Sequence, residues 1–407
     1  MDRRRALFAL MAAALPFPAF AGQCADAAAN GADMAWLIDQ LAAHYAYLPD
    51  RHVDLDRLRA IYVAQAKNAC DAHAFLGVLE QCLAEFHDHH IEAGVNNAAS
   101  PQLVPTGAEA WAAFHDGRAI IEAVRPASSL MREGVRAGDE VIAIADRPVR
   151  EAVAAHAPKT LTSSDPEADD YTLRVLLAGT HSAQRIFTAR GRAGDRRIVL
   201  PPHEPAPDGP PLTLLRPAPG IALIRVENSL GDNALVAAFD RALEQSRDAR
   251  GLILDLRNTP SGGNTDVAEP ILGRFVTGHP GYQRVLDPPH REWVRKVKSR
   301  GETVAVPMVV LCSRWTGSMG EGMTIGLDGL KRATVVGTRM AGLCGATSGF
   351  LLPNGRIEIQ FPTERLYHLD GTPRERWSPP VLVDLANAPA GDPILARGVS
   401  MLREKSG

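Results

Sequence analysis

Residues 251–264, with the sequence GLILDLRNTPSGGN, indicate the architecture of the chain. The stretch from Gly251 to Leu256, apolar except for Asp255, is typical of a strand that is buried on both faces of a parallel sheet. It leads into a turn whose paired glycines, Gly262 and Gly263, let the backbone approach another group closely. Reactive groups in α/β sheets gather where strands end and helices begin. The turn is therefore either a plain connection or a site whose amide groups suit an oxyanion, each donor being worth about 3–4 kcal/mol of barrier.

Strands and helices alternate around this stretch. We expect strands at 221–226, 251–256, 306–312 and 333–336, and helices at 234–246 and 319–330. Such alternation predicts a mainly parallel sheet covered by helices, and hence the α/β class. A turn at Pro353-Asn354-Gly355 then predicts a hairpin over residues 350–361.

The part of the chain before this domain divides at two linkers. Apolar residues at helical spacing predict three helices between Met34 and about His87. A stretch rich in Asn, Ala, Ser and Pro at 98–105 and a proline-rich stretch at 201–219 are typical of linkers. We therefore expect an N-terminal helical domain at 22–100, a β-rich domain at 104–205 and the α/β domain at 206–403.

A second strand-to-helix junction lies at residues 309–321, VVLCSRWTGSMGE. It places Ser318 at the start of the predicted helix. A serine at this position is either a helix N-cap or a nucleophile, and the junction alone leaves both open.

Two stretches of the β-rich domain and both junctions carry a resemblance to known families. Residues 134–144, GVRAGDEVIAI after the strand 118–124, resemble the G-x-x-x-GD signature of PDZ domains, which bind extended peptides at a sheet edge.

Asp255-Leu256-Arg257 through Gly262-Gly263 resembles the D-L-R-x-N-x-GG motif of the C-terminal-processing (tail-specific) serine proteases, which include the tricorn core. Thr316 to Glu321 resembles the T-A-S-A-S-E motif of that family. The resemblance implies a crotonase/ClpP-like spiral fold, a polypeptide substrate and a nucleophile at Ser318.

The resemblance also bears on the catalytic base. Many bacterial members carry a lysine where this chain has Leu343, so a Ser-Lys dyad is not expected. The tricorn-like branch takes a histidine from an L-x-D-x-H motif and a downstream glutamate, which correspond to His90 in Phe86-His-Asp-His-His90 and to Glu375. In that branch a serine often precedes the histidine and links it to the glutamate. His89 stands at this position here, so either His89 makes the link to Glu375 or the link between base and glutamate is altered.

The resemblance thus implies a Ser-His-Glu peptidase in which backbone amides at Gly262 or Gly263 and at Met319 form the oxyanion hole. Several alternatives stay open. The histidines at 87, 89 and 90 with Asp88 are either solvated or metal-binding, although their spacing does not match metallo-hydrolases. Glu375 lies in a charged run that is also typical of a solvated loop. Because the lysine is missing and Gly320 replaces the family's second serine, the chain is alternatively a non-catalytic peptide- or lipid-binding protein.

Composition narrows the range of functions. The 407 residues are 45% hydrophobic and 22% charged, with a net charge of −3 that favours neither nucleic acid nor anionic lipid as partner. Five cysteines without a CxxC pair disfavour a zinc site, and no phosphate-binding fingerprint points to a cofactor.

The first residues predict export. Arg3 to Arg5, an apolar run and the sequence Ala19-Phe20-Ala21 are typical of a signal peptide at 1–21, too short and too proline-rich for a membrane span. We therefore expect a periplasmic or secreted protein, in which Cys24 can pair with Cys70 or Cys82.

Overall fold

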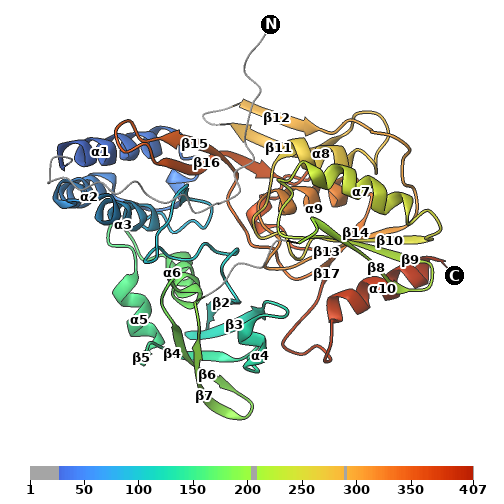
Figure 1. Cartoon of the computed structure of the whole chain (residues 1–407), viewed down its shortest axis with the longest axis horizontal. Coiled ribbons are helices and arrows are strands. Elements are labelled where there is room, and N and C mark those ends of the chain that lie inside the picture. The colour runs from blue at the N-terminus through green and yellow to red at the C-terminus, as the bar shows by residue number, and fades with distance from the viewer. Residues whose placement is uncertain (1–26, 203–208, 288–290, 407) are drawn as a thin grey trace, which may run out of the picture.

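The computed structural model describes residues 27–202, 209–287 and 291–406. The predicted signal peptide and Cys24 lie outside these residues. Figure 1 shows three parts: a helical unit, a β-rich domain and a domain built on a parallel sheet. The α/β class expected from the sequence is confirmed.

The parallel sheet is the centre of the third part. Its strand order is β17-β14-β13-β10-β9-β8, and all neighbours run parallel except β8, which is antiparallel to β9. The strands are β8 (Leu212–Ala218), β9 (Ile221–Val226), β10 (Gly251–Asp255), β13 (Met308–Cys312), β14 (Thr334–Gly337) and β17 (Val381–Leu382). Every residue of β10 and β13 is buried, as their apolar runs predict, and the burial extends to Asp255 at the end of β10.

Helices cover both faces of this sheet. Alternate residues of the strands point to opposite faces, so Leu252 and Leu254 belong to one core cluster while Ile253 belongs to another. The first cluster includes apolar residues of α7 (Ala234–Glu244), α8 (Thr265–Leu272) and α9 (Met319–Gly329), and the second includes those of α10 (Pro393–Ser406).

The interpretation of residues 201–219 as a linker is wrong at its C-terminal end. Residues 212–218 form the edge strand β8, because leucines at 212, 214 and 215 pair with β9. Pro217 is tolerated because it lies at an edge where the register shifts between Leu215 and Ala218.

The three predicted N-terminal helices are present as α1 (Ala27–His44), α2 (Leu55–Asn68) and α3 (Ala72–Ala84), with a short 3-10 turn η2 (Leu48–Asp50) after α1. They share one core with the predicted hairpin, formed by β15 (Ala346–Leu351) and β16 (Glu358–Tyr367). The Asp33 carboxylate accepts hydrogen bonds from the backbone N–H groups of Asn354 and Gly355, at 3.0 and 2.6 Å, and so ties α1 to the hairpin turn. Strands β1 (Glu92–Ala93), β11 (Gly281–Asp287) and β12 (Arg291–Lys296) complete this sheet in the order β1-β16-β11-β12.

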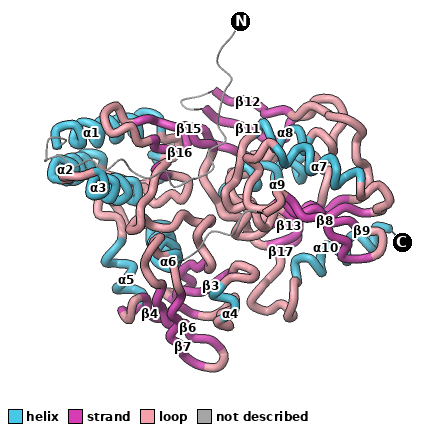
Figure 2. The backbone as a smooth tube through the Cα atoms, in the orientation of Figure 1, coloured by secondary structure: helices cyan, strands magenta, loops and turns pink. Residues whose placement is uncertain are grey.

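The β-rich domain has the strand order β2-β3-β4-β6-β7, with β5 paired to β4. Gly134 and Gly138, which the sequence places in turns, have φ values of +79° and +92°. The strands are β2 (Ala110–His115), β3 (Arg118–Val124), β4 (Glu140–Ile144), β5 (Arg147–Pro148), β6 (Arg185–Gly191) and β7 (Gly194–Leu200), and the helices are α4 (Ser129–Arg132), α5 (Val149–His156) and α6 (Pro166–Ala178). Figure 2 shows that loops occupy the centre of the molecule, where the three parts meet.

Candidate active site

Ser318 stands at the junction between β13 and α9, as the N-cap of the helix. Its backbone has φ 46° and ψ −111°, a conformation that non-glycine residues rarely adopt and that costs on the order of 1–3 kcal/mol. The side chain is partly exposed, while its neighbours Gly317 and Met319 are buried. The junction therefore presents one hydroxyl to solvent on an otherwise buried turn.

His90 reaches Ser318 from the loop after α3. Its Nε2 lies 3.0 Å from Ser318 Oγ, although the two residues are 228 positions apart. Its Nδ1 lies 2.5 Å from the backbone carbonyl oxygen of Cys344. Because a carbonyl can only accept, Nδ1 carries the proton and Nε2 is free to accept the hydrogen of the Ser318 hydroxyl. This is the tautomer that a general base requires.

The environment keeps this imidazole neutral. Burial, and after it the positive charge of Arg374, lower the pKa of His90 to about 4, against the opposing effects of the Cys344 carbonyl and the Asp88 carboxylate. At neutral pH His90 is therefore unprotonated and able to take a proton.

Asp88 fixes the loop that carries His90. Its Oδ1 accepts the backbone N–H of His90 at 2.9 Å, and its Oδ2 accepts the Tyr45 hydroxyl at 2.8 Å. Arg51 donates to the same tyrosine oxygen at 3.0 Å and lies 3.7 Å from the carboxylate. The base is thus placed by a buried network rather than by a free loop.

The other two histidines of this segment contact α6. His87 Nε2 lies 2.9 Å from the Asp165 carboxylate, at the N-cap of that helix. His89 stacks on Tyr171 with ring centroids 4.4 Å apart and accepts a hydrogen bond from Arg174 at 3.1 Å. His89 therefore does not bridge to Glu375. Among the described residues, no group of three or more His, Cys, Asp or Glu side chains is arranged to hold a metal ion.

Glu375 does not contact His90. It lies in the short 3-10 turn η3 (Arg374–Arg376), where its carboxylate accepts a hydrogen bond from the Tyr47 hydroxyl at 3.3 Å. Burial raises the pKa of Glu375. The family resemblance implies this glutamate as the partner of the imidazole, whereas the backbone carbonyl of Cys344 occupies that position in the structure.

The amide groups expected to form an oxyanion hole are not equivalent. The Gly262 N–H donates to the carbonyl of Thr259 at 3.1 Å, so it is already used in the turn. The N–H groups of Gly263 and Met319 have no acceptor among the described residues. Gly262 instead provides space, because a Cβ there would lie 2.5 Å from Ser318 Cβ. Gly263 and Met319 are the donors available for an oxyanion.

Glu321 was not predicted as a site residue, yet it organises this junction. Its carboxylate, fully buried, accepts the backbone N–H groups of Ser318, Gly342 and Leu343 at 2.9, 2.8 and 3.2 Å. Burial raises the pKa of Glu321 to about 7, although Arg374 and the three donors oppose the shift. The S-x-x-E spacing of a capping box is the sequence signal that was available for this residue.

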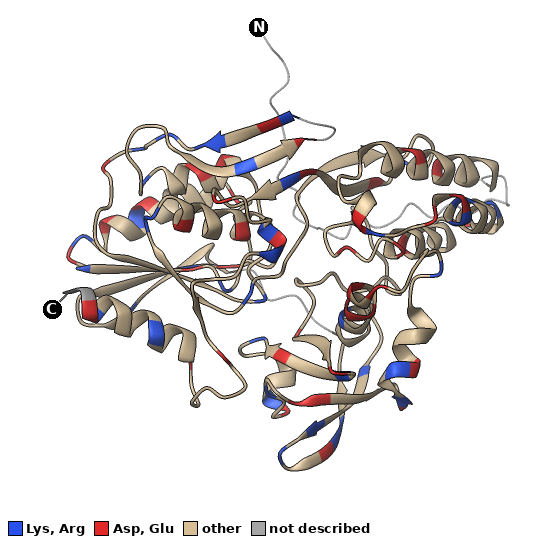
Figure 3. Cartoon of the chain, turned by 180° about the vertical axis from the view of Figure 1, so that it is seen from behind, with Lys and Arg blue, Asp and Glu red and all other residues tan. Residues whose placement is uncertain are grey.

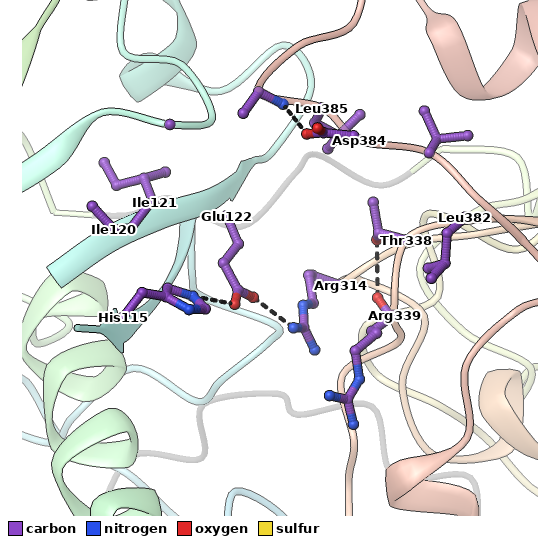
Figure 4. Close-up of a pocket in the computed structure, with 13 residues that line it drawn as sticks. His115, Ile120, Ile121, Glu122, Arg314, Thr338, Arg339, Leu382, Asp384 and Leu385 are labelled. Atoms are coloured by element: carbon purple, nitrogen blue, oxygen red, sulfur yellow. Dashed lines mark hydrogen bonds and ion pairs between the residues drawn. The ribbon is translucent and has the colours of Figure 1, made fainter. Parts of the chain in front are cut away.

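A pocket of about 280 Å³ lies between β3 and the segments that follow β14 and β17 (Figure 4). Arg314 donates to the Glu122 carboxylate at 2.5 Å, and His115 lies 2.9 Å from the other carboxylate oxygen. Neither Ser318 nor His90 lines this pocket. It marks the contact of the β-rich domain with the segment that leads into Ser318.

Charge and hydropathy add two further observations. Basic and acidic residues are interspersed over all three parts of the chain (Figure 3). Within the described residues, no helix combines the length and the apolar character needed to cross a bilayer.

Solved structures with the same fold support the architecture. The photosystem II D1 C-terminal processing protease superposes with a TM-score of 0.58 at 17% identity, covering 91% of this chain and 96% of that chain. Mature CPAF superposes with a TM-score of 0.57 at 15% identity, over 94% and 96% of the two chains. A lipoprotein from Streptococcus agalactiae superposes with a TM-score of 0.51 at 12% identity, over 96% and 100%. At these identities the likeness is one of fold.

The sequence itself is informative about the family. A comparison with curated protein sequences finds no match. Residues 220–380 match the family model described as peptidase family S41, and this range contains both glycines of the turn and Ser318. The resemblance drawn from the two motifs is therefore confirmed. Residues 220–380 thus form a domain of peptidase family S41, and the chain is a serine-type peptidase.

Proposed function

We propose that the chain hydrolyses peptide bonds through an acyl-enzyme formed on Ser318, with His90 as the general base and acid. The observation that carries this proposal is the 3.0 Å contact between His90 Nε2 and Ser318 Oγ, with Nδ1 donating to a carbonyl. A serine hydroxyl at its ordinary pKa is a weak nucleophile, so a neutral imidazole at this distance supplies what the reaction needs.

In the first half of the reaction, Ser318 Oγ attacks the carbonyl carbon of a peptide bond while His90 Nε2 takes the hydroxyl proton. The negative charge on the carbonyl oxygen is stabilised by the N–H groups of Gly263 and Met319. The tetrahedral intermediate collapses, His90 gives its proton to the leaving amine, and an ester remains on Ser318. Water then attacks the ester with the same base, and the released acid leaves Ser318 free.

A fluorophosphonate probe tests this assignment. We expect covalent labelling of the purified protein that mass spectrometry maps to Ser318, since the probe reacts with activated serines. Heat-unfolded protein is the control and should not react. Labelling of another residue would contradict the assignment. No labelling together with measurable affinity for peptides would favour a binding protein on the same fold.

We also propose that the chain is exported to the periplasm or secreted. Residues 1–21 have the composition of a cleaved signal peptide, and Cys70 is disulfide-bonded, a state that is rare in the cytosol. Intact-mass measurement of protein made with its own leader is expected to give a chain that starts at Gly22. A mass that retains residues 1–21 would contradict the proposal.

A further inference from the structure

The loop at residues 342–345 supplies the acceptor for His90, and two buried charged side chains hold its peptide groups. Glu321 accepts the N–H groups of Gly342 and Leu343, at 2.8 and 3.2 Å. One Nη of Arg374 donates to the carbonyls of Leu343 and Gly345, at 2.9 and 2.6 Å. These carbonyls flank that of Cys344 on both sides, so the two side chains together fix the peptide groups around it.

Both side chains are costly to bury, which indicates that they are not incidental. Glu321 is fully buried and Arg374 is 3% exposed. Arg374 Nε has no hydrogen-bond partner among the described residues. A buried charge of this kind persists where its remaining hydrogen bonds fix a geometry that the surroundings need.

A second cation holds the side chain of Cys344 in the same loop. Arg51 donates to the Cys344 thiol at 3.0 Å, from within the network that also positions Asp88. The loop is therefore anchored to the segment that carries His90 as well as to the helix that carries Ser318.

We propose that Glu321 and Arg374 are positioning residues, which hold the backbone carbonyl of Cys344 against His90 Nδ1 and so orient the base. The inference rests on the proposed function of Ser318 and His90. A carbonyl is a weaker partner for an imidazolium than a carboxylate, because it carries no charge. It can orient the ring only if it cannot turn away, and the clamp formed by Glu321 and Arg374 prevents that movement.

The clamp also links base and nucleophile. Glu321 accepts the Ser318 N–H at 2.9 Å with the same carboxylate that holds the loop. A shift of the carboxylate therefore changes the position of the hydroxyl and of the imidazole at once. Misplacement of reacting groups by about 1 Å costs on the order of 10²-fold in rate.

The first test replaces Arg374 by lysine, with Arg376→Lys as the matched control in the same turn. Lysine keeps the charge, but its side chain is one atom shorter and lacks the planar guanidinium that directs one Nη at both carbonyls. We expect kcat to fall about 10- to 100-fold with KM changed less than about twofold, while Arg376→Lys, at an exposed position, behaves as wild type.

A spectroscopic measurement separates positioning from general stability. The proton on His90 Nδ1 is expected to give a downfield nuclear magnetic resonance signal that disappears in His90→Ala. In Arg374→Lys we expect this signal to shift or broaden while the thermal midpoint and the circular dichroism spectrum stay close to wild type. An unchanged signal together with an unchanged kcat would overturn the proposal.

The second test replaces Glu321 by glutamine and covers the case in which Arg374→Lys does not fold. An amide oxygen accepts, but the amide nitrogen donates and cannot accept the remaining N–H groups. The charged or titratable groups that act on Glu321 or feel its charge are Arg374 of η3, Arg314 after β13 and the Cys312 thiol of β13.

The pH profile is the readout for this variant. Wild-type kcat/KM is expected to fall in two steps on acidification, first as Glu321 protonates near its pKa of about 7 and again as His90 protonates near its pKa of about 4. In Glu321→Gln the step near pH 7 should be absent and the plateau about tenfold lower or more. Identical pH profiles and equal plateaus in the two proteins would overturn the proposal. Inactive wild-type protein would instead contradict the proposed function itself.

Discussion

Ser318→Ala and His90→Ala are each expected to lower kcat by roughly 10⁴-fold or more, and the double variant is expected to lose no more than the single ones. The reason is geometric. His90 Nε2 lies 3.0 Å from Ser318 Oγ, so base and nucleophile act as one unit, and removing either leaves the other without a partner in proton transfer.

The measurement is turnover of an unfolded protein substrate, with circular dichroism and thermal unfolding to show that each variant is folded. His73→Ala and Ser348→Ala are matched controls, because both side chains are exposed and lie outside the site. If the fold-losses in kcat of the two single variants multiply in the double variant, the two residues act independently. That result would contradict the expectation that Ser318 and His90 act as one unit. A His90→Ala variant within tenfold of wild type would exclude His90 as the base.

Gly262→Ala is expected to lower kcat at least about 100-fold. The added Cβ would lie 2.5 Å from Ser318 Cβ and 3.3 Å from the Met319 nitrogen, at a residue with φ +64°. The hydroxyl and one oxyanion donor must both move to make room. Positive φ adds a strain of roughly 1–2 kcal/mol for alanine.

Gly278→Ala is the matched control for this prediction. Its φ is +69°, but a Cβ there meets nothing within 4 Å, so it measures the backbone strain alone. We expect the backbone strain to lower the thermal stability of both variants by a similar amount. Gly262→Ala should lose additional stability through the contact with Ser318, and it alone should lose activity. Equal activities in the two variants would show that the approach of Gly262 to Ser318 is not needed.

Much of the fold can be predicted from the sequence, and the reason is physical. Strands β10 and β13 are buried on both faces and therefore appear as apolar runs, with Asp255 at the end of β10 as the one exception. Strand β8 is partly exposed and has a proline just before its last residue, so its sequence resembles that of a linker. The three helices of the N-terminal unit follow from apolar spacing, whereas their packing on a hairpin more than 250 residues away cannot be read from periodicity.

The candidate site likewise has residues that can be predicted from the sequence and others that cannot. Ser318 and His90 belong to motifs with recognisable side chains, and the structure brings them together. The acceptor at His90 Nδ1 is a main-chain oxygen, which any residue at position 344 would supply, so residue identity does not reveal it. Glu375 has the chemistry of a third catalytic group, but its turn directs it to Tyr47.

The bond between Asp33 and the turn at residues 354–355 has a consequence for biosynthesis. The three helices that precede the His90 loop cannot complete their hydrophobic core until the hairpin has been synthesised, because Leu352, Ile357, Ile359 and Phe361 form part of that core. Contacts of such long sequence separation form late in folding. A nascent chain thus lacks part of the core beside the His90 loop until residue 361 of 407 has been synthesised.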